Sequence, residues 1–131
     1  MDVLIFAESD ENGNIKNDAL EIASYAYEIS SQNGGKLKAI CFNSKNPEKL
    51  SIYGVEKIIN SKNVELKNFD AGIYSDCISD VFKSEGCSIL ILSASSNSKH
   101  MGGILSVKMD AGYVTNVISI PKNENNMVVI R

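Results

Sequence analysis

Two short, continuous apolar runs most constrain what this chain can fold into. Residues 3–6 read V-L-I-F and residues 89–92 read I-L-I-L, and polar residues bound both runs. A strand with one face in water alternates apolar and polar residues, whereas an unbroken run is typical of a strand covered on both faces, as in a parallel sheet. The two runs therefore predict central strands of a sheet with helices on both sides.

Helical patterns separate the segments that read as strands. Apolar residues recur at spacings of three and four within residues 15–29 and 73–82, and strand-like segments lie at residues 37–42, 55–59, 112–120 and 127–130. Alternation of strand and helix implies right-handed crossovers. We expect an α/β fold, a three-layer doubly wound and mainly parallel sheet in the order 3-2-1-4-5. Residues 123–126 are interpreted as a turn into a carboxy-terminal antiparallel strand.

Length and composition indicate one domain over residues 1–131, because 44% of the residues are apolar and 22% are charged. A net charge of -3 without a Lys or Arg run argues against a nucleic-acid partner. The longest apolar stretch is far shorter than the roughly 20 residues that cross a bilayer, so no membrane insertion is expected. No presequence precedes the first strand, which favours the cytoplasm. Three cysteines without a C-x-x-C pair indicate reduced thiols and no metal site.

The expected strand order brings two loops to one crevice at the carboxyl ends of the first and fourth strands, residues 7–12 and 93–99. Ser95, Ser98 and Lys99 combine hydroxyls, free backbone N–H groups at a helix start and a cation, so they are candidate ligands for an anion or nucleotide. A polar cap without a ligand is the alternative. Further residues of these loops and of the next strand are candidates for contact with a partner, or for a site at the switch point where the strand order reverses. They are Glu8, Ser93, Ala94, His100, Thr115 and Asn116.

Motifs for nucleotide binding and catalysis are missing. The first loop has no G-x-G-x-x-G and carries Glu8, Asp10 and Glu11, acids that repel a phosphate, and no P-loop occurs. Glu8 and Asp10 are interpreted as solvated loop charges rather than as an acid/base pair. His100 is the single histidine, and no convergent base and nucleophile accompany it. No catalytic residue is therefore assigned.

Four stretches nevertheless carry a resemblance that covers essentially the whole chain. They are V-L-I-F-A-E at residues 3–8, I-Y-G-V-E-K-I at 52–58, S-A-S-S-N-S-K-H at 93–100 and D-A-G-Y-V-T-N at 110–116. In this order they resemble the amino-terminal domain of the electron-transfer flavoprotein alpha subunit. The third stretch departs from the family pattern, because Ser93 and Ser98 replace glycines and His100 replaces an acid.

The resemblance implies a fold similar to the adenine nucleotide alpha hydrolases and a role in electron transport. In the family, a carboxy-terminal domain binds FAD. We expect the given chain to lack that domain, so this chain alone is not expected to bind FAD. The implied partners are the beta subunit in a heterodimer, the flavin-binding domain of the alpha subunit, and dehydrogenases that donate electrons through the complex. AMP is expected in the beta subunit. The cofactor performs the redox chemistry, so the chain is expected to be a scaffold and not an enzyme on its own.

Two other functions stay open from the residues alone. The first is a stand-alone sensor of adenine nucleotides or phosphate that uses residues 93–99 and the helix behind them. The second, an enzyme that uses Glu8 or His100, lacks the convergent groups that catalysis needs.

Overall fold

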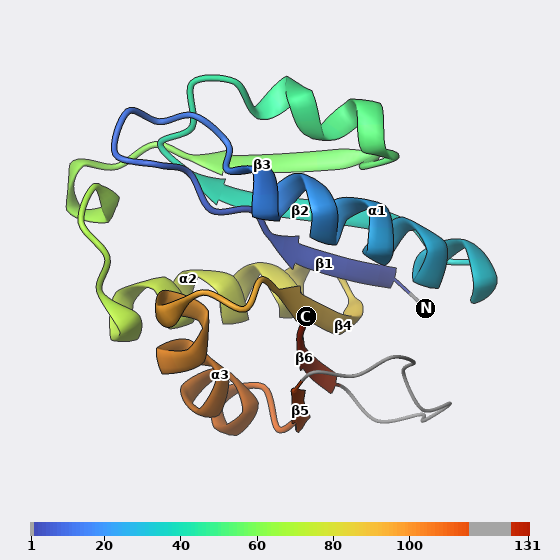
Figure 1. Ribbon diagram of the computed structural model, residues 1–131. Helices are drawn as coiled ribbons and strands as arrows, with labels where there is room; N and C mark the ends of the chain where they lie inside the picture. The colour runs from blue at the N-terminus through green and yellow to red at the C-terminus, as the bar shows by residue number, and fades with distance from the viewer. Residues whose placement is uncertain (1, 116–126) are drawn as a thin grey trace.

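A computed structural model describes residues 2–115 and 127–131 (Figure 1). Its strands are β1 (Asp2–Phe6), β2 (Leu37–Phe42), β3 (Lys57–Ser61), β4 (Cys87–Leu92), β5 (Gly112–Thr115) and β6 (Met127–Ile130). The α-helices are α1 (Asn17–Gln32), α2 (Ala71–Ser84) and α3 (Ser96–Lys108), and two 3₁₀ helices are η1 (Pro47–Tyr53) and η2 (Val64–Leu66). All the strands join one sheet in the order β3-β2-β1-β4-β6-β5.

The doubly wound α/β fold is confirmed, with β1 and β4 side by side at the centre. The predicted carboxy-terminal antiparallel strand is wrong. β6 runs parallel to both of its neighbours and lies between β4 and β5. Its four residues are all buried, as a central parallel strand requires. The interpreted turn at residues 123–126 and the predicted strand beyond residue 115 lie outside the described residues.

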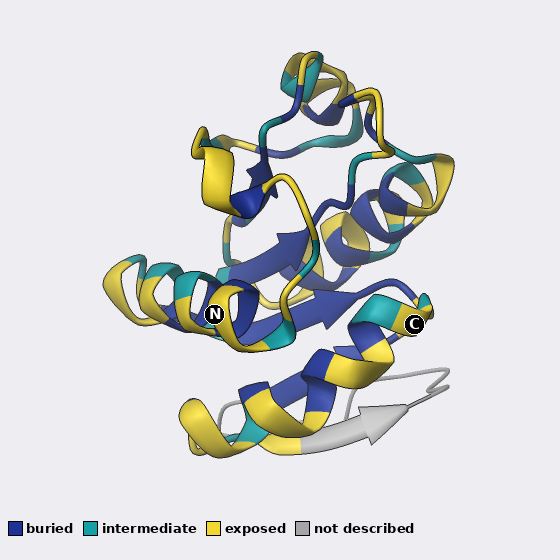
Figure 2. Ribbon diagram, turned by 90° about the vertical axis from the view of Figure 1, so that its left-hand side faces the viewer, coloured by how far each residue is buried: buried dark blue, intermediate teal, exposed yellow. Residues whose placement is uncertain are grey.

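Alternate residues of each central strand pack into two separate cores. In β1, Val3 and Ile5 face the α1 side, whereas Leu4 and Phe6 face α2 and α3. Figure 2 shows the central strands β1, β2, β4 and β6 almost wholly buried, while the helices each expose one side. Both faces of the sheet are therefore dry, which is the physical reason why the apolar runs lack alternation.

Local signals begin and end several elements. The Asp70 carboxylate accepts a hydrogen bond from the backbone N–H of Ile73 at 2.9 Å and so caps α2. Pro47 opens η1, where its missing N–H leaves no bond unmade, and Gly54 ends it in the left-handed conformation at φ 91°. Because β1, β2 and β4 run parallel, the loops that follow them lie along the carboxyl edge of the sheet.

Candidate functional site

Glu8 lies at the centre of the crevice between β1 and β4. It follows the last residue of β1 by two positions, and the parallel register that pairs Ile5 with Ile91 brings the start of the loop after β4 beside it. Only 6% of Glu8 is exposed. A carboxylate buried to this degree needs hydrogen-bond donors, because its desolvation is otherwise costly.

Three serine hydroxyls supply those donors. Ser98 donates to Glu8 Oε1 at 3.1 Å, Ser93 donates to the same oxygen at 3.4 Å, and Ser95 makes a shorter bond to it. The other oxygen, Oε2, lies 3.3 Å from the ammonium group of Lys16, which is itself 41% exposed. The cluster thus joins β1, the loop after β4 and the start of α3 through one carboxylate.

The same serines form the amino-terminal cap of α3. Ser95 Oγ accepts a hydrogen bond from the backbone N–H of Ser98 at 3.1 Å, and the helix begins at Ser96. A negative charge at a helix amino terminus interacts favourably with the helix dipole. Glu8 therefore stands in the position where the sequence predicts an external anion, and it is the chain's own anion.

The interpretation of Glu8 as a solvated loop charge is wrong, whereas Asp10 is indeed exposed. Sequence reasoning missed the contact because the serines lie 85 to 90 positions away along the chain. One signal was available: Glu8 and Ser93 both come within two residues of the ends of two neighbouring buried strands.

The other candidate residues do not join this cluster. Ala94, Lys99 and His100 are exposed, and within residues 2–115 and 127–131 neither Lys99 nor His100 has an ion-pair partner. Thr115 ends β5, two strands away from β4, and Asn116 lies outside the described residues. Whether Ser95, Ser98 and Lys99 bind an anion or nucleotide stays a prediction.

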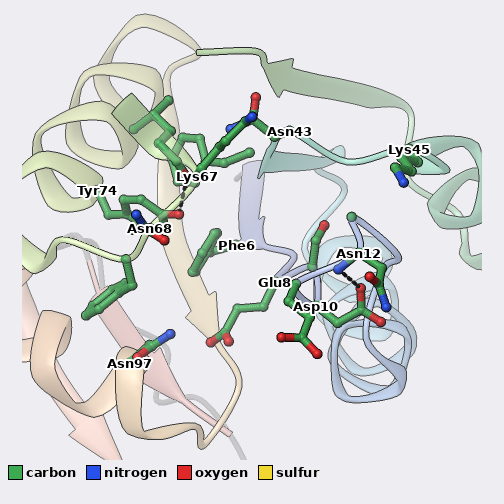
Figure 3. Close-up of a pocket in the computed structure, with 16 residues that line it drawn as sticks. Phe6, Glu8, Asp10, Asn12, Asn43, Lys45, Lys67, Asn68, Tyr74 and Asn97 are labelled. Atoms are coloured by element: carbon green, nitrogen blue, oxygen red, sulfur yellow. Dashed lines mark hydrogen bonds between the residues drawn. The ribbon is translucent and has the colours of Figure 1, made fainter. Parts of the chain in front are cut away.

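A cleft of about 590 Å³ opens beside Glu8 at the carboxyl ends of β1 and β2 (Figure 3). Its lining includes four aromatic rings, Phe6, Phe42, Phe69 and Tyr74. The centroids of Phe42 and Tyr74 are 4.5 Å apart, those of Phe69 and Tyr74 are 5.1 Å apart, and those of Phe6 and Phe42 are 5.6 Å apart. Burial raises the pKa of the Tyr74 phenol, and the charge of Glu8 raises it further.

This aromatic cluster was not predicted. The tyrosines are dispersed in the sequence, but Phe6 and Phe42 are the last residues of neighbouring parallel strands, and that equivalence brings their rings together. In the described part of the chain, no group of three or more His, Cys, Asp or Glu side chains could hold a metal ion. None of the described helices is both long enough and apolar enough to span a bilayer.

Comparison with known families decides what kind of domain carries this site. The family model for the electron transfer flavoprotein domain matches residues 3–131. The chain belongs to this electron transfer flavoprotein domain family. The match confirms the resemblance at the level of the family.

A curated relative of this electron transfer flavoprotein domain is the acryloyl-CoA reductase electron transfer subunit beta of Anaerotignum propionicum. The two are 23% identical over 130 residues, which make up 97% of this chain and 35% of the relative. The chain thus spans about one third of the length of that relative. Because the relative is named a subunit beta, assignment to the alpha subunit stays a prediction.

The first of two similar solved structures supports the fold, and the fold alone. A universal stress protein from Archaeoglobus fulgidus matches with a TM-score of 0.56 and 11% identity, covering 100% of this chain and 93% of the other. A universal stress protein in complex with cAMP matches with a TM-score of 0.48 and 10% identity, covering 98% of this chain and 95% of the other.

Proposed function

We propose that this chain is a scaffold domain of an electron transfer flavoprotein. We propose further that it corresponds to the amino-terminal domain of the alpha subunit and supports an FAD-bearing domain. The observation that carries the proposal is the family match across residues 3–131. An electron transfer subunit among its relatives agrees with it. The four sequence stretches that resemble the alpha subunit support the finer assignment.

The chemistry of the crevice supports the expectation that FAD binds elsewhere. A dinucleotide places its pyrophosphate against free backbone N–H groups at a helix amino terminus. Here the N–H of Ser98 donates to Ser95, and the hydroxyls of both residues are directed at Glu8. A helix cap that already directs its hydroxyls at a carboxylate weighs against a pyrophosphate at α3.

The proposed partners follow from the scaffold role. They are an electron transfer flavoprotein beta subunit, the flavin-binding domain, and dehydrogenases that pass electrons to the assembled complex. The proposed site for AMP is in the beta subunit. The flavin supplies the electron-carrying chemistry when the complex is assembled. This chain's own part is to hold the position of its neighbours, so we expect no turnover from it alone.

Co-expression with a beta-type subunit from the same genome tests the proposal. We expect the two chains to co-elute in size-exclusion chromatography at equal stoichiometry, and we expect the isolated chain to purify without the visible absorbance of a flavin. A stoichiometric flavin on the isolated chain would overturn the absence of an FAD site. Failure of every beta-type subunit to co-elute would overturn the scaffold role.

A stand-alone nucleotide or phosphate sensor remains the alternative from another class of function. Glu8 occupies the anion position at the start of α3, and this weighs against the sensor. Isothermal titration calorimetry with AMP and ATP separates the two functions: micromolar binding that Lys99→Glu abolishes favours the sensor, and no binding favours the scaffold.

A further inference from the structure

We propose that Asn33, at the end of α1, is a site of spontaneous deamidation, and that the fold protects Asn12 from the same reaction. Both residues are followed by glycine, and the sequence contains no other Asn-Gly pair. The two pairs share their chemistry but differ in their surroundings. This inference does not depend on the scaffold role.

Deamidation begins with an attack within the backbone. The nitrogen of the glycine bonds to Cγ of the asparagine, the bond from Cγ to Nδ2 breaks, and ammonia leaves with the proton that the glycine nitrogen loses. Water then opens the five-membered imide at either carbonyl and leaves an aspartate or an isoaspartate. Glycine favours this ring closure because it has no Cβ and its backbone is permissive. Both pairs are therefore reactive once the chain around them is free to move.

Asn33 is the C-cap of α1, with ψ 5°. At this ψ the nitrogen of Gly34 does not lie over Cγ of Asn33, so the helix end must open before the ring can close. The N–H of Gly34 donates to the Ser31 carbonyl at 3.3 Å, which is a weak bond. Asn33 Nδ2 donates to the Ile29 carbonyl at 2.8 Å, and the N–H of Gly35 also bonds back to the helix at 2.8 Å.

Exposure makes this helix end easy to open. Asn33 and Gly34 are both exposed, and a Cβ built on Gly34 would have no atom within 4 Å. No packed side chain therefore resists a rotation of the backbone here. Helix ends fray, and exposed segments with few buried contacts open at low free energy. The reactive conformation is thus accessible from the native fold at Asn33.

The loop around Asn12 is held more firmly. Asp10 Oδ1 accepts hydrogen bonds from the backbone N–H groups of Asn12 at 2.9 Å and Asn14 at 3.0 Å. The carbonyl of Asp10 accepts from Gly13 at 3.0 Å, and the carbonyl of Gly13 accepts from Lys45 at 2.8 Å. Gly13 is also buried, and a Cβ built on it would lie 3.0 Å from Lys45 Cγ. Moving the Gly13 nitrogen breaks more contacts than fraying the end of α1.

Deamidation at Asn33 changes the end of the helix. The new carboxylate has no N–H group to donate to the Ile29 carbonyl, and it adds a negative charge at the negative end of the helix dipole. The last turn of α1 contains no basic residue that would offset this charge. Figure 1 shows this end of α1 on the side of the sheet where β1 and β2 begin, opposite the carboxyl edge. The modification therefore weakens the end of α1 and leaves the Glu8 cluster in place.

Timed incubation of the 131-residue chain in mildly alkaline buffer, followed by proteolysis and mass spectrometry, measures the rate at each site. In the native chain we expect Asn33 to deamidate at least about fivefold faster than Asn12, the factor that roughly one additional hydrogen bond in the closed state supplies. Isoaspartate among the products identifies the imide route. In guanidinium chloride the fold is lost, so we expect the two rates to agree within about twofold.

The comparison of native and unfolded chains separates the effect of the fold from that of the local sequence. A ratio of rates in the native chain no larger than the ratio in guanidinium chloride overturns the proposal. Faster reaction at Asn12 than at Asn33 in the native chain also overturns it. The same holds if native Asn33 stays intact over a time in which the unfolded chain reacts completely.

A variant that carries the product measures the consequence for stability. We expect Asn33→Asp to unfold at a lower urea concentration than the unmodified chain, and we expect aged native protein to shift toward it. Asn12→Asp is the matched control, because Asn12 is exposed in a loop and caps no helix, and we expect a smaller shift. An unchanged midpoint in Asn33→Asp overturns the effect on α1. None of these outcomes bears on co-elution with a beta-type subunit, so the two proposals fail separately.

Discussion

Replacement of Glu8 by Gln tests how much the buried cluster stabilises the fold. The substitution keeps the shape of the side chain, removes its charge and replaces one acceptor oxygen with an NH₂ group. That group must face either the serine hydroxyls or the ammonium of Lys16, since these are the partners of the two oxygens. Whichever orientation it takes, a favourable contact is lost.

The magnitude follows from the individual contacts. The bonds from Ser95 and Ser98 count fully, and the 3.4 Å bond from Ser93 adds little. A hydrogen bond to a charged acceptor contributes roughly 1.5–3 kcal/mol and a neutral one roughly 0.5–1.5 kcal/mol, so each strong bond loses about 1 kcal/mol. The ion pair with half-exposed Lys16 adds less than about 1 kcal/mol after screening. We expect Glu8→Gln to lower the free energy of unfolding by about 2–3 kcal/mol.

Urea unfolding of the 131-residue chain at neutral pH measures this loss. Glu11→Gln is the matched control, because Glu11 is an exposed acid of the same loop with no ion-pair partner among the described residues, and we expect a change within about 0.5 kcal/mol. Lys16→Met isolates the ion pair and should cost less than about 1 kcal/mol.

The reasoning is refuted if Glu8→Gln unfolds as late as the Glu11 control, or if Lys16→Met costs more than Glu8→Gln. A double-mutant cycle adds a second check. Because Ser98 donates directly to Glu8, Ser98→Ala combined with Glu8→Gln should show a coupling free energy of about 1 kcal/mol. Additive effects would show that the two side chains do not interact.

Two further predictions concern other parts of the fold. Burial raises the pKa of the Cys41 and Cys87 thiols to about 11, so at pH 8 only about one thiol in a thousand is ionised. We expect both thiols to react with a thiol reagent only when urea unfolds the chain. Rapid labelling of these thiols in the native protein would contradict this. Gly54→Ala should lower the free energy of unfolding by about 2–4 kcal/mol, because the new Cβ would lie 2.3 Å from the ring of Tyr27 and the backbone has φ +91°. Gly34→Ala is the control, because Gly34 has φ +68° and a Cβ there would have no atom within 4 Å. This variant carries the backbone strain alone, so we expect it to lower the free energy of unfolding by about 1–2 kcal/mol. Equal losses in the two variants would rule out a clash with Tyr27.

The centre of the sheet could be predicted from the sequence because burial on two faces leaves a local signature. The runs at β1 and β4 lack alternation, and the structure places these strands side by side. M-V-V-I is also an unbroken apolar run, so it carries the signature of burial on both faces, but so short a run does not say which strands lie beside β6 or in which direction they run. The place of β6 in the sheet depends on partners elsewhere in the chain, which the strand itself does not encode.

The location of the candidate site could be predicted from the sequence, but the contacts between its side chains could not. Strand order brought residues 7–12 and 93–99 to one edge, and Glu8 and Ser98 do meet there. Their contact spans 90 positions, and nothing near Glu8 in the sequence separates a solvated acid from a buried one. The aromatic lining of the cleft escaped for a similar reason, because Phe42 and Tyr74 lie on separate elements and meet only in three dimensions.

The place of β6 also bears on how the protein folds as it is made. It is the last described strand to leave the ribosome, yet it is inserted between β4 and β5. Until residues 127–130 emerge, the nascent chain carries β4 with one edge unpaired, and an open edge of this kind recruits other strands. Completion of the sheet therefore waits until residues 127–130 have emerged, and the interval before that is when a chaperone would be needed most.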